Sequence, residues 1–286
     1  PMSCEVQLRG GEWTAVLVPG TGGALAALDW RGEPVLRRAR GAGVLDMACF
    51  PLVPFANRIA HSRFAFAGQD VRLTSDHPAG PGEPAIHGFG WLAAWDVAER
   101  EERFAALVHH HRCGDWPWDF AARQTLTLGE TARLTLGITN LSDTAMPAGL
   151  GFHPYFPRSP DTVLAARHRG EWQVDGRTLP VRLVTRPAPV DWWDGRPVES
   201  RIVDTAYTGR AGPMAIRWPG RGIEAVLEPS PDLPVTFVYV PGAEDYFCVE
   251  PASHASDALN RPGEMRVLQP GESWSVSLTI RAGALR

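Results

Sequence analysis

The residues of this chain that could do chemistry are a few carboxylates, histidines and one arginine, set within or beside apolar runs. The clearest case is Glu250, which ends the apolar run 246–249 and precedes Pro251. Because proline disfavours helix at the residue before it, Glu250 is expected at the end of a buried, extended strand. An ionised carboxylate is costly to take out of water unless a cation, donors or a polar ligand compensate it. We therefore expect another polar group, or a ligand, to face Glu250.

A second candidate is His153, which lies between aromatic residues and directly before Pro154. A single histidine among aromatics is more often a core residue with a satisfied hydrogen bond than a catalyst. The presence of a buried carboxylate elsewhere in the chain favours the functional interpretation. An imidazole and a carboxylate can donate and accept protons near neutral pH. Together, His153 and Glu250 predict an acid–base site.

Three further stretches carry polar groups in apolar surroundings. Arg58 lies in the proline-containing run 50–59, so it either faces solvent or pairs with a buried acid. Asp204 follows a short apolar run and, taken alone, is typical of a turn. The stretch 85–91 places His87 before two glycines and two aromatics, and its flat rings could take a sugar. A tryptophan-rich core loop explains that stretch equally well.

The pattern of the whole chain is one of short segments separated by glycine and proline turns. The segments alternate or are apolar, and none sustains a period of 3.6 residues. This predicts an all-β fold, a large antiparallel sandwich, formed as one domain over residues 1–286. We expect residues 161–200 to be connecting loops. The main predicted strands are 5–8, 13–18, 24–30, 95–98, 104–108, 120–126, 132–138, 214–218, 223–227, 235–240, 246–251, 265–268 and 274–280.

Composition narrows the class of protein. The 286 residues are 44% hydrophobic and 21% charged with a net charge of −4, which is ordinary for a soluble protein and predicts no nucleic-acid or membrane partner. No apolar run is long enough to span a bilayer, and no signal-peptide pattern opens the chain. The four cysteines form no CxxC pair, so we expect free thiols and a cytoplasmic location. The three adjacent histidines 109–111 would alternate between faces of a strand, which argues against one shared metal ion.

The ordered set of motifs resembles the aldose 1-epimerase, or galactose mutarotase, family. The matching pieces are Asn57-Arg58-Ile59, His87-Gly88, His153-Pro154-Tyr155-Phe156, Asp204, Cys248-Val249-Glu250-Pro251 and Asp257-Ala258-Leu259-Asn260. The resemblance implies a galactose mutarotase-like β-supersandwich with a cleft on one sheet. It also implies an isomerase of carbohydrate metabolism that binds a free monosaccharide and interconverts its α and β anomers. Such an enzyme uses no cofactor and no metal, and we expect a monomer or homodimer.

The resemblance also implies roles for individual residues. Glu250 would be the base and His153 the acid, with His87 near the ring oxygen. The residues expected to hold sugar hydroxyls are Arg58, Asp204 and Asn57. An aromatic ring beside the sugar is also implied, and the candidates are Tyr239, Phe89 and Trp91. The residues after His87 and after Asp204 depart from the usual family pattern, which leaves the sugar's identity open.

A base must be ionised at rest, so we expect Arg58 or backbone donors to offset the burial of Glu250. Three alternatives stay open. A hexose-6-phosphate 1-epimerase would bind its phosphate through an arginine cluster, drawn from Arg37, Arg38, Arg40 or Arg63. A β-sandwich of this type could also bind sugar without catalysis. A metal-dependent enzyme could use His87, His153 and Glu250 as ligands.

Overall fold

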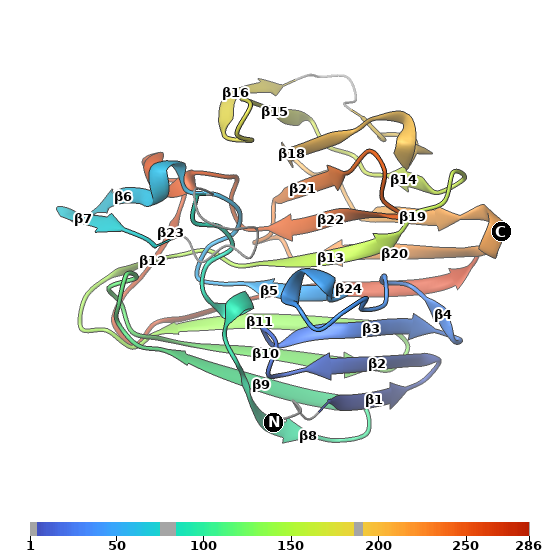
Figure 1. The fold of residues 1–286 in the computed structure, drawn as a ribbon, viewed down its shortest axis with the longest axis horizontal. Helices are drawn as coiled ribbons and strands as arrows, with labels where there is room; N and C mark the ends of the chain where they lie inside the picture. The colour runs from blue at the N-terminus through green and yellow to red at the C-terminus, as the bar shows by residue number, and fades with distance from the viewer. Residues whose placement is uncertain (1–4, 75–83, 186–190, 286) are drawn as a thin grey trace.

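The computed structural model describes residues 5–74, 84–185 and 191–285, and its main feature is a pair of large antiparallel sheets (Figure 1). One sheet has 11 strands in the order β1-β2-β3-β5-β13-β22-β21-β18-β15-β16, with β4 paired to β3. The other has nine strands in the order β17-β14-β19-β20-β24-β11-β10-β9-β8. The predicted all-β sandwich is confirmed. The single domain over residues 1–286 stays a prediction.

The strands are short and closely spaced along the chain. Those of the 11-stranded sheet are β1 (Val6–Gly10), β2 (Trp13–Val18), β3 (Ala24–Trp30), β4 (Glu33–Pro34), β5 (Cys49–Leu52), β13 (Gly151–Pro157), β15 (Gly170–Val174), β16 (Pro180–Thr185), β18 (Val203–Thr208), β21 (Val235–Val240) and β22 (Tyr246–Ala252). Those of the nine-stranded sheet are β8 (Asp96–Arg100), β9 (Phe104–His111), β10 (Phe120–Leu128), β11 (Ala132–Asn140), β14 (Val163–Ala165), β17 (Arg196–Pro197), β19 (Met214–Trp218), β20 (Ile223–Pro229) and β24 (Ser273–Ala284).

Smaller elements lie at the margins of the sandwich. Two small two-stranded sheets are β6 (Arg63–Phe66) with β7 (Gln69–Arg72), and β12 (Met146–Ala148) with β23 (Arg266–Leu268). The described helices are single turns of 3₁₀ type: η1 (Val44–Asp46), η2 (Ala60–Ser62), η3 (Gly90–Leu92), η4 (Val198–Ser200), η5 (Pro219–Arg221) and η6 (Ala258–Asn260). No helix within the described residues has the length and apolar character that crossing a bilayer would require.

The main core lies between the two sheets, and the alternation of each strand explains it. On β22, Phe247 and Val249 point into this core, while Cys248 and Glu250 point away from it. On β13, Phe152 and Phe156 point inward in the same way. The outer face of the 11-stranded sheet therefore carries the polar residues of the site.

A second buried cluster covers this outer face around the polar residues. It includes Phe50 of β5, Trp91 of the η3 turn and Phe237 of β21, all nearly inaccessible to solvent. Loops before β5, after β5 and around η3 supply much of the cover, which keeps water from the middle of the sheet. The site is consequently built on a rigid central part of the sheet, with its surroundings packed as tightly as a core.

One expectation about the fold was wrong. Residues 161–200 are not simply connecting loops, because they contribute β14, β15, β16 and β17. These strands are short and lie at or near sheet edges, where partial exposure weakens the sequence pattern that identifies a strand. The proline- and glycine-rich stretch 75–84, which the sequence predicts to be a loop, lies almost entirely outside the described residues. The free thiols expected from the sequence are confirmed for Cys49, Cys113 and Cys248.

Candidate active site

The antiparallel register of β13 and β22 brings His153 and Glu250 together. Gly151 pairs with Ala252 and Tyr155 pairs with Cys248, so His153 lies opposite Glu250 between these pairs. Both side chains leave the same face of the sheet, and Nε2 of His153 lies 3.4 Å from Oε1 of Glu250. Each of the two residues precedes a proline, and both adopt the predicted extended backbone of a strand. The prediction that Glu250 ends its strand was wrong, because β22 continues through Pro251 to Ala252, which pairs with Gly151 and Val235.

The pair is almost fully removed from water. Glu250 is 3% exposed and His153 is 7% exposed. Burial raises the pKa of Glu250 well above its ordinary value, the charge of Asp204 raises this pKa further, and Arg58 opposes the change. Burial, helped by the positive charge of Arg37, lowers the pKa of His153 to about 3. Both shifts favour the uncharged form of each group.

We expected Arg58 to offset the effect of burial on the pKa of Glu250, and it does so only in part. Its guanidinium lowers the pKa of Glu250, but burial is the larger effect. Arg58 is instead closest to Asp204, with 3.8 Å between its terminal nitrogen and Oδ2 of Asp204. The Oε2 atom of Glu250 is buried and has no hydrogen-bond partner among the residues that the structure describes. A bound ligand could therefore donate a hydrogen bond to this oxygen atom.

Asp204 lies two strands away from Glu250 on the same face. It belongs to β18 and pairs with Tyr239 of β21, which in turn pairs with Cys248 of β22. It is not a turn residue, which is the interpretation that its sequence context alone favours. Burial raises the pKa of Asp204, and Arg58 lowers it in part. The Arg58–Asp204 contact consequently forms one side of the site, and His153 with Glu250 forms another.

Asn57 and His87 hold each other in place across two loops. The backbone N–H of Asn57 donates to Nδ1 of His87 at 3.2 Å, and the N–H of His87 donates to the carbonyl of Asn57 at 3.1 Å. Both residues have positive φ, 58° and 62°, a conformation that is uncommon outside glycine. Because Nδ1 accepts a hydrogen bond, a neutral His87 carries its proton on Nε2. Its ring lies 5.0 Å from that of His153, at nearly a right angle.

The motif 257–260 positions the loop that carries Arg58. The N–H of Asp257 donates to the carbonyl of Arg58 at 2.7 Å, and Oδ1 of Asp257 accepts from Ala60 N–H at 2.9 Å and from Asn260 at 2.7 Å. Just before this motif, the Ser256 hydroxyl donates to Oδ1 of Asn57 at 2.6 Å. This motif therefore has a supporting role, and Ser256 is a residue that the sequence did not single out.

The two glycines after His87 allow a close approach to the loop after β5. A Cβ atom at Gly88 would lie 2.1 Å from the carbonyl oxygen of Val53, and Gly88 has a φ of 73°. The aromatic residues that follow, Phe89 and Trp91, both pack against the protein interior. Trp91 is fully buried, and Phe89 packs against Phe55. The core interpretation of stretch 85–91 therefore holds for both rings.

One aromatic residue beside Glu250 is Phe237, which sequence reasoning missed. It lies opposite Glu250 on one side and opposite Ala206 on the other. Tyr239, one of the three aromatic candidates, is two residues further along β21, next to Asp204 and Cys248. No sequence signal distinguished Phe237, because its outward orientation depends on the register of β21.

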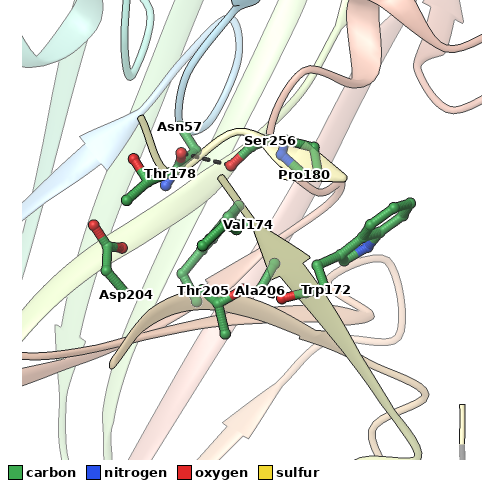
Figure 2. Close-up of a pocket in the computed structure, with 10 residues that line it drawn as sticks. Asn57, Trp172, Val174, Thr178, Pro180, Asp204, Thr205, Ala206 and Ser256 are labelled. Carbon is green, nitrogen blue, oxygen red and sulfur yellow. Dashed lines mark hydrogen bonds between the residues drawn. The ribbon is translucent and has the colours of Figure 1, made fainter. Parts of the chain in front are cut away.

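A small pocket adjoins the Asp204 side of the site (Figure 2). Its unfilled space is about 230 Å³ when the open solvent at its mouth is counted, and neither His153 nor Glu250 lines it. Figure 2 shows Asn57, Thr178 and Asp204 on one side of this pocket and Trp172 on the other. Polar groups that converge beside apolar walls are typical of sites for small polar ligands. The pocket extends the candidate site away from His153 and Glu250, toward β15.

Arg37 contacts the ring of Tyr155, which in turn stacks on the ring of His153. The ring of Tyr155 stacks on His153 with 4.7 Å between centroids, and the guanidinium of Arg37 lies 4.2 Å from the Tyr155 centroid. Arg37 also donates to the carbonyls of Leu45 and Met47, at 3.0 and 2.8 Å. It is therefore a structural residue rather than an open anion-binding group.

The other arginines considered for a phosphate are paired with acids. Arg38 contacts Asp29, and Arg63 contacts Asp70. Arg40 contacts both Glu244 and Asp245. A phosphate would have to compete with these carboxylates.

The residues that could hold a metal ion differ from the expected triad. A ring nitrogen of His153, the sulfur of Cys248 and a carboxylate oxygen of Glu250 all lie within 4.8 Å of one another. The third ligand expected from the sequence was His87, whose Nδ1 accepts the hydrogen bond from Asn57.

Comparison with known proteins agrees with the motifs. Residues 4–281 match the aldose 1-epimerase family. The chain is 33% identical over 264 residues to the uncharacterised Escherichia coli (strain K12) protein YphB, covering 88% of this chain and 90% of that one. The crystal structure of a provisionally assigned aldose 1-epimerase from Escherichia coli K12 superposes with a TM-score of 0.90, at 31% identity and 99% coverage of both chains.

More distant structures share the fold. A galactose mutarotase-like protein from Clostridium acetobutylicum superposes with a TM-score of 0.86 at 18% identity, covering 98% of this chain and 95% of that one. The chain belongs to the aldose 1-epimerase family, and its fold is the galactose mutarotase-like β-sandwich.

Proposed function

We propose that the protein is an aldose 1-epimerase, a mutarotase that interconverts the α and β anomers of a free aldose. The observation that carries this proposal is the contact between His153 and Glu250, at 3.4 Å on one face of the sheet. A hemiacetal carries its hydroxyl oxygen and its ring oxygen on the same carbon atom. An acid and a base that already face each other can therefore reach both oxygens of one bound sugar.

In the proposed reaction, Glu250 takes the proton from the C1 hydroxyl while His153 gives a proton to the ring oxygen, O5. The C1–O5 bond breaks and leaves an open-chain aldehyde. Rotation about the C1–C2 bond exposes the other face of the aldehyde to the C5 hydroxyl. The two groups then exchange roles: His153 takes the proton back and Glu250 returns its proton, which closes the ring as the other anomer.

Burial acts differently on the two arrangements of the shared proton in this cycle. Before ring opening, the pair carries one proton, on His153, and Glu250 is ionised. After opening, the proton is on Glu250 and His153 is neutral. Burial raises the pKa of Glu250 and lowers the pKa of His153, so it favours the second arrangement. Hydroxyl donors of a bound sugar would restore the ionised carboxylate, because Oε2 of Glu250 has no donor among the described residues.

Other residues would bind the sugar. We propose that Arg58, Asp204 and Asn57 hold its hydroxyls and that His87 approaches O5 through Nε2. Phe237 offers an apolar ring face beside Glu250, where the C–H face of a pyranose can pack. A free sugar is favoured over a 6-phosphate, because Arg38, Arg40 and Arg63 are paired with acids and Arg37 is held by carbonyls and tyrosines.

Polarimetry of freshly dissolved sugars tests this function. The assay would follow the optical rotation of α-glucose, α-galactose and glucose 6-phosphate with and without the protein. We expect faster mutarotation of at least one free aldose and little effect on the phosphate. A protein that binds these sugars, by calorimetry, without changing any rate would be a sugar-binding β-sandwich instead. Cytoplasmic location, oligomeric state and a role in carbohydrate metabolism stay predictions.

A further inference from the structure

The same face of the sheet brings together three different metal-ligating groups. Cys248 and Glu250 are two residues apart on β22, so both side chains point outward. His153 reaches them from β13, and one ligand atom from each residue lies within 4.8 Å of the others. Sulfur, nitrogen and oxygen donors of this kind are those that zinc binds in proteins. Nothing in the acid–base chemistry proposed above uses the thiol of Cys248.

The spacing of two of these groups already suits a tetrahedral ion. Zinc lies about 2.0–2.2 Å from nitrogen and oxygen ligands, so these ligands are about 3.3–3.5 Å apart around it. Nε2 of His153 and Oε1 of Glu250 are 3.4 Å apart. A sulfur ligand at about 2.3 Å from zinc would lie about 3.6 Å from the nitrogen. The Cys248 sulfur, which lies within 4.8 Å, would have to approach slightly.

An independent observation points to a ligand at this position. Oε2 of Glu250 is buried and has no hydrogen-bond partner within the described part of the chain. A carboxylate buried to this degree without donors is unusual, because buried polar atoms are nearly always paired. A cation would satisfy it, and a three-residue site would leave the fourth position of a tetrahedral ion for water.

We propose that His153, Cys248 and Glu250 bind a thiophilic divalent cation, with Zn²⁺ as the representative ion, and that this ion inhibits the enzyme. The bound ion takes the lone pairs of His153 Nε2 and of the Glu250 carboxylate. It thereby removes both the base and the acid that ring opening requires. The inhibitory part of this proposal rests on the mutarotase function proposed above, whereas the binding part does not.

Calorimetric titration of the full chain with zinc chloride tests the site directly. The wild type and the Cys49→Ala control should each bind one equivalent. Cys49 is a matched control because it is a buried free thiol of the same sheet that belongs to the core between the sheets. The Cys248→Ala variant should bind about 100-fold more weakly or worse, since even the loss of a group that only orients a ligand costs about 10–100-fold in metal affinity. Cys113→Ala removes the exposed thiol and should bind like the wild type.

Polarimetry of the same proteins tests the inhibition. Zinc should abolish mutarotation by the wild type and by Cys49→Ala, and Cys248→Ala should stay active at the same zinc concentration. If no protein shows mutarotation, calorimetry still decides whether the site exists. If Cys248→Ala does not fold, the wild type loaded with Co²⁺ should show a thiolate-to-cobalt charge-transfer band. Absence of one-equivalent binding, equal binding by Cys248→Ala, or absence of that band would overturn the proposal.

Discussion

The imidazole of His153 faces the carboxylate of Glu250 because the register of two central strands places the residues opposite each other. The same register sends the flanking residues Phe152 and Val249 into the core between the sheets. A slip of one residue in either strand would therefore expose core side chains and turn His153 or Glu250 toward the core between the sheets. The packing that stabilises the sheet also fixes the geometry of the proposed site.

The pH dependence of the rate follows from this pair. It must hold one proton, and it gains a second only near the pKa of His153, which burial lowers to about 3. It loses its proton only above the raised pKa of Glu250. We therefore expect the loss of kcat/KM in acid to occur near pH 3 rather than near 6.5, the ordinary pKa of histidine, and the loss on the alkaline side to begin only when the pH passes the raised pKa of Glu250. Polarimetry at a series of pH values, with the buffer rate subtracted at each, should show no rise in kcat/KM between pH 5.5 and 7.5, a window of about one unit either side of 6.5; a rise there would refute this assignment.

Replacement of Asp204 should change both binding and titration. Asp204→Asn removes a negative charge that raises the pKa of Glu250, so the alkaline loss of activity should move to lower pH. KM should rise about 10- to 100-fold, since a hydrogen bond to a charged group is worth about 1.5–3 kcal/mol.

Arg58→Met should shift the pKa of Glu250 in the opposite direction from Asp204→Asn, because Arg58 lowers this pKa. Its alkaline limit should move to higher pH. Shifts of the same sign in the two variants would show that Glu250 does not sense these charges.

The motif 257–260 should matter for stability and substrate affinity rather than for the chemical step. Asp257→Ala leaves the Ala60 N–H without its acceptor and puts alanine at a φ of 59°. We expect a loss of about 2–3 kcal/mol in the free energy of unfolding, from the unpaired donor and the strained backbone. KM should rise more than kcat falls, because Asp257 holds the Arg58 loop. Asp257→Asn keeps an oxygen acceptor and should behave nearly like the wild type in urea denaturation and in the kinetic assay.

Stability should decrease as the pH falls below 6.5. Burial lowers the pKa of His153 to about 3 and those of His168 and His254 to about 4. The unfolded chain then binds protons that the folded chain does not. Glu250, with its raised pKa, acts in the opposite direction. Burial also lowers the pKa values of His109 and His111 and raises that of Asp204. Because these five histidines outnumber the two acids, the net uptake on unfolding is at least one proton, which predicts a loss of at least about 1.4 kcal/mol per pH unit between about pH 6 and 4.5.

Urea denaturation at several pH values measures this slope. His254→Gln should reduce it by about one proton, because Gln can still accept from Ala56 N–H in place of Nε2. His110→Gln, at an exposed position on β9, should leave the slope unchanged. A stability that stays flat over this range would contradict the burial of the imidazoles of His153, His168 and His254.

The sequence predicted best those features that depend on residues next to one another in the chain, namely backbone conformation and burial. The continuous apolar run 246–249 predicted a buried strand, and the prolines after His153 and Glu250 predicted extended backbone at both. Sequence could not supply the register between strands that are distant along the chain. It therefore identified Tyr239 as a candidate but not Phe237, whose position depends on how β21 lies beside β22.

The sequence also could not predict which of the opposing effects on the pKa of Glu250 is larger. A pattern can indicate that Arg58 approaches a buried acid, but it cannot show that Asp204 is nearer to it than Glu250, or that burial outweighs the attraction. The edge strands β14 to β17 were missed for a different reason. They are short and partly exposed, so neighbouring strands rather than their own alternation keep them extended.

The most direct test of the proposed function is the mutarotation rate of the Glu250→Gln variant, measured by polarimetry on whichever aldose the wild type turns over. Glutamine has nearly the same shape but cannot accept the C1 proton. We expect kcat to fall about 10²–10⁴-fold with the fold retained, the range for loss of one positioned acid–base group. The exposed Glu199→Gln variant should keep the wild-type rate. A Glu250→Gln protein that is folded and as active as the wild type would contradict the proposed role of Glu250 as the base.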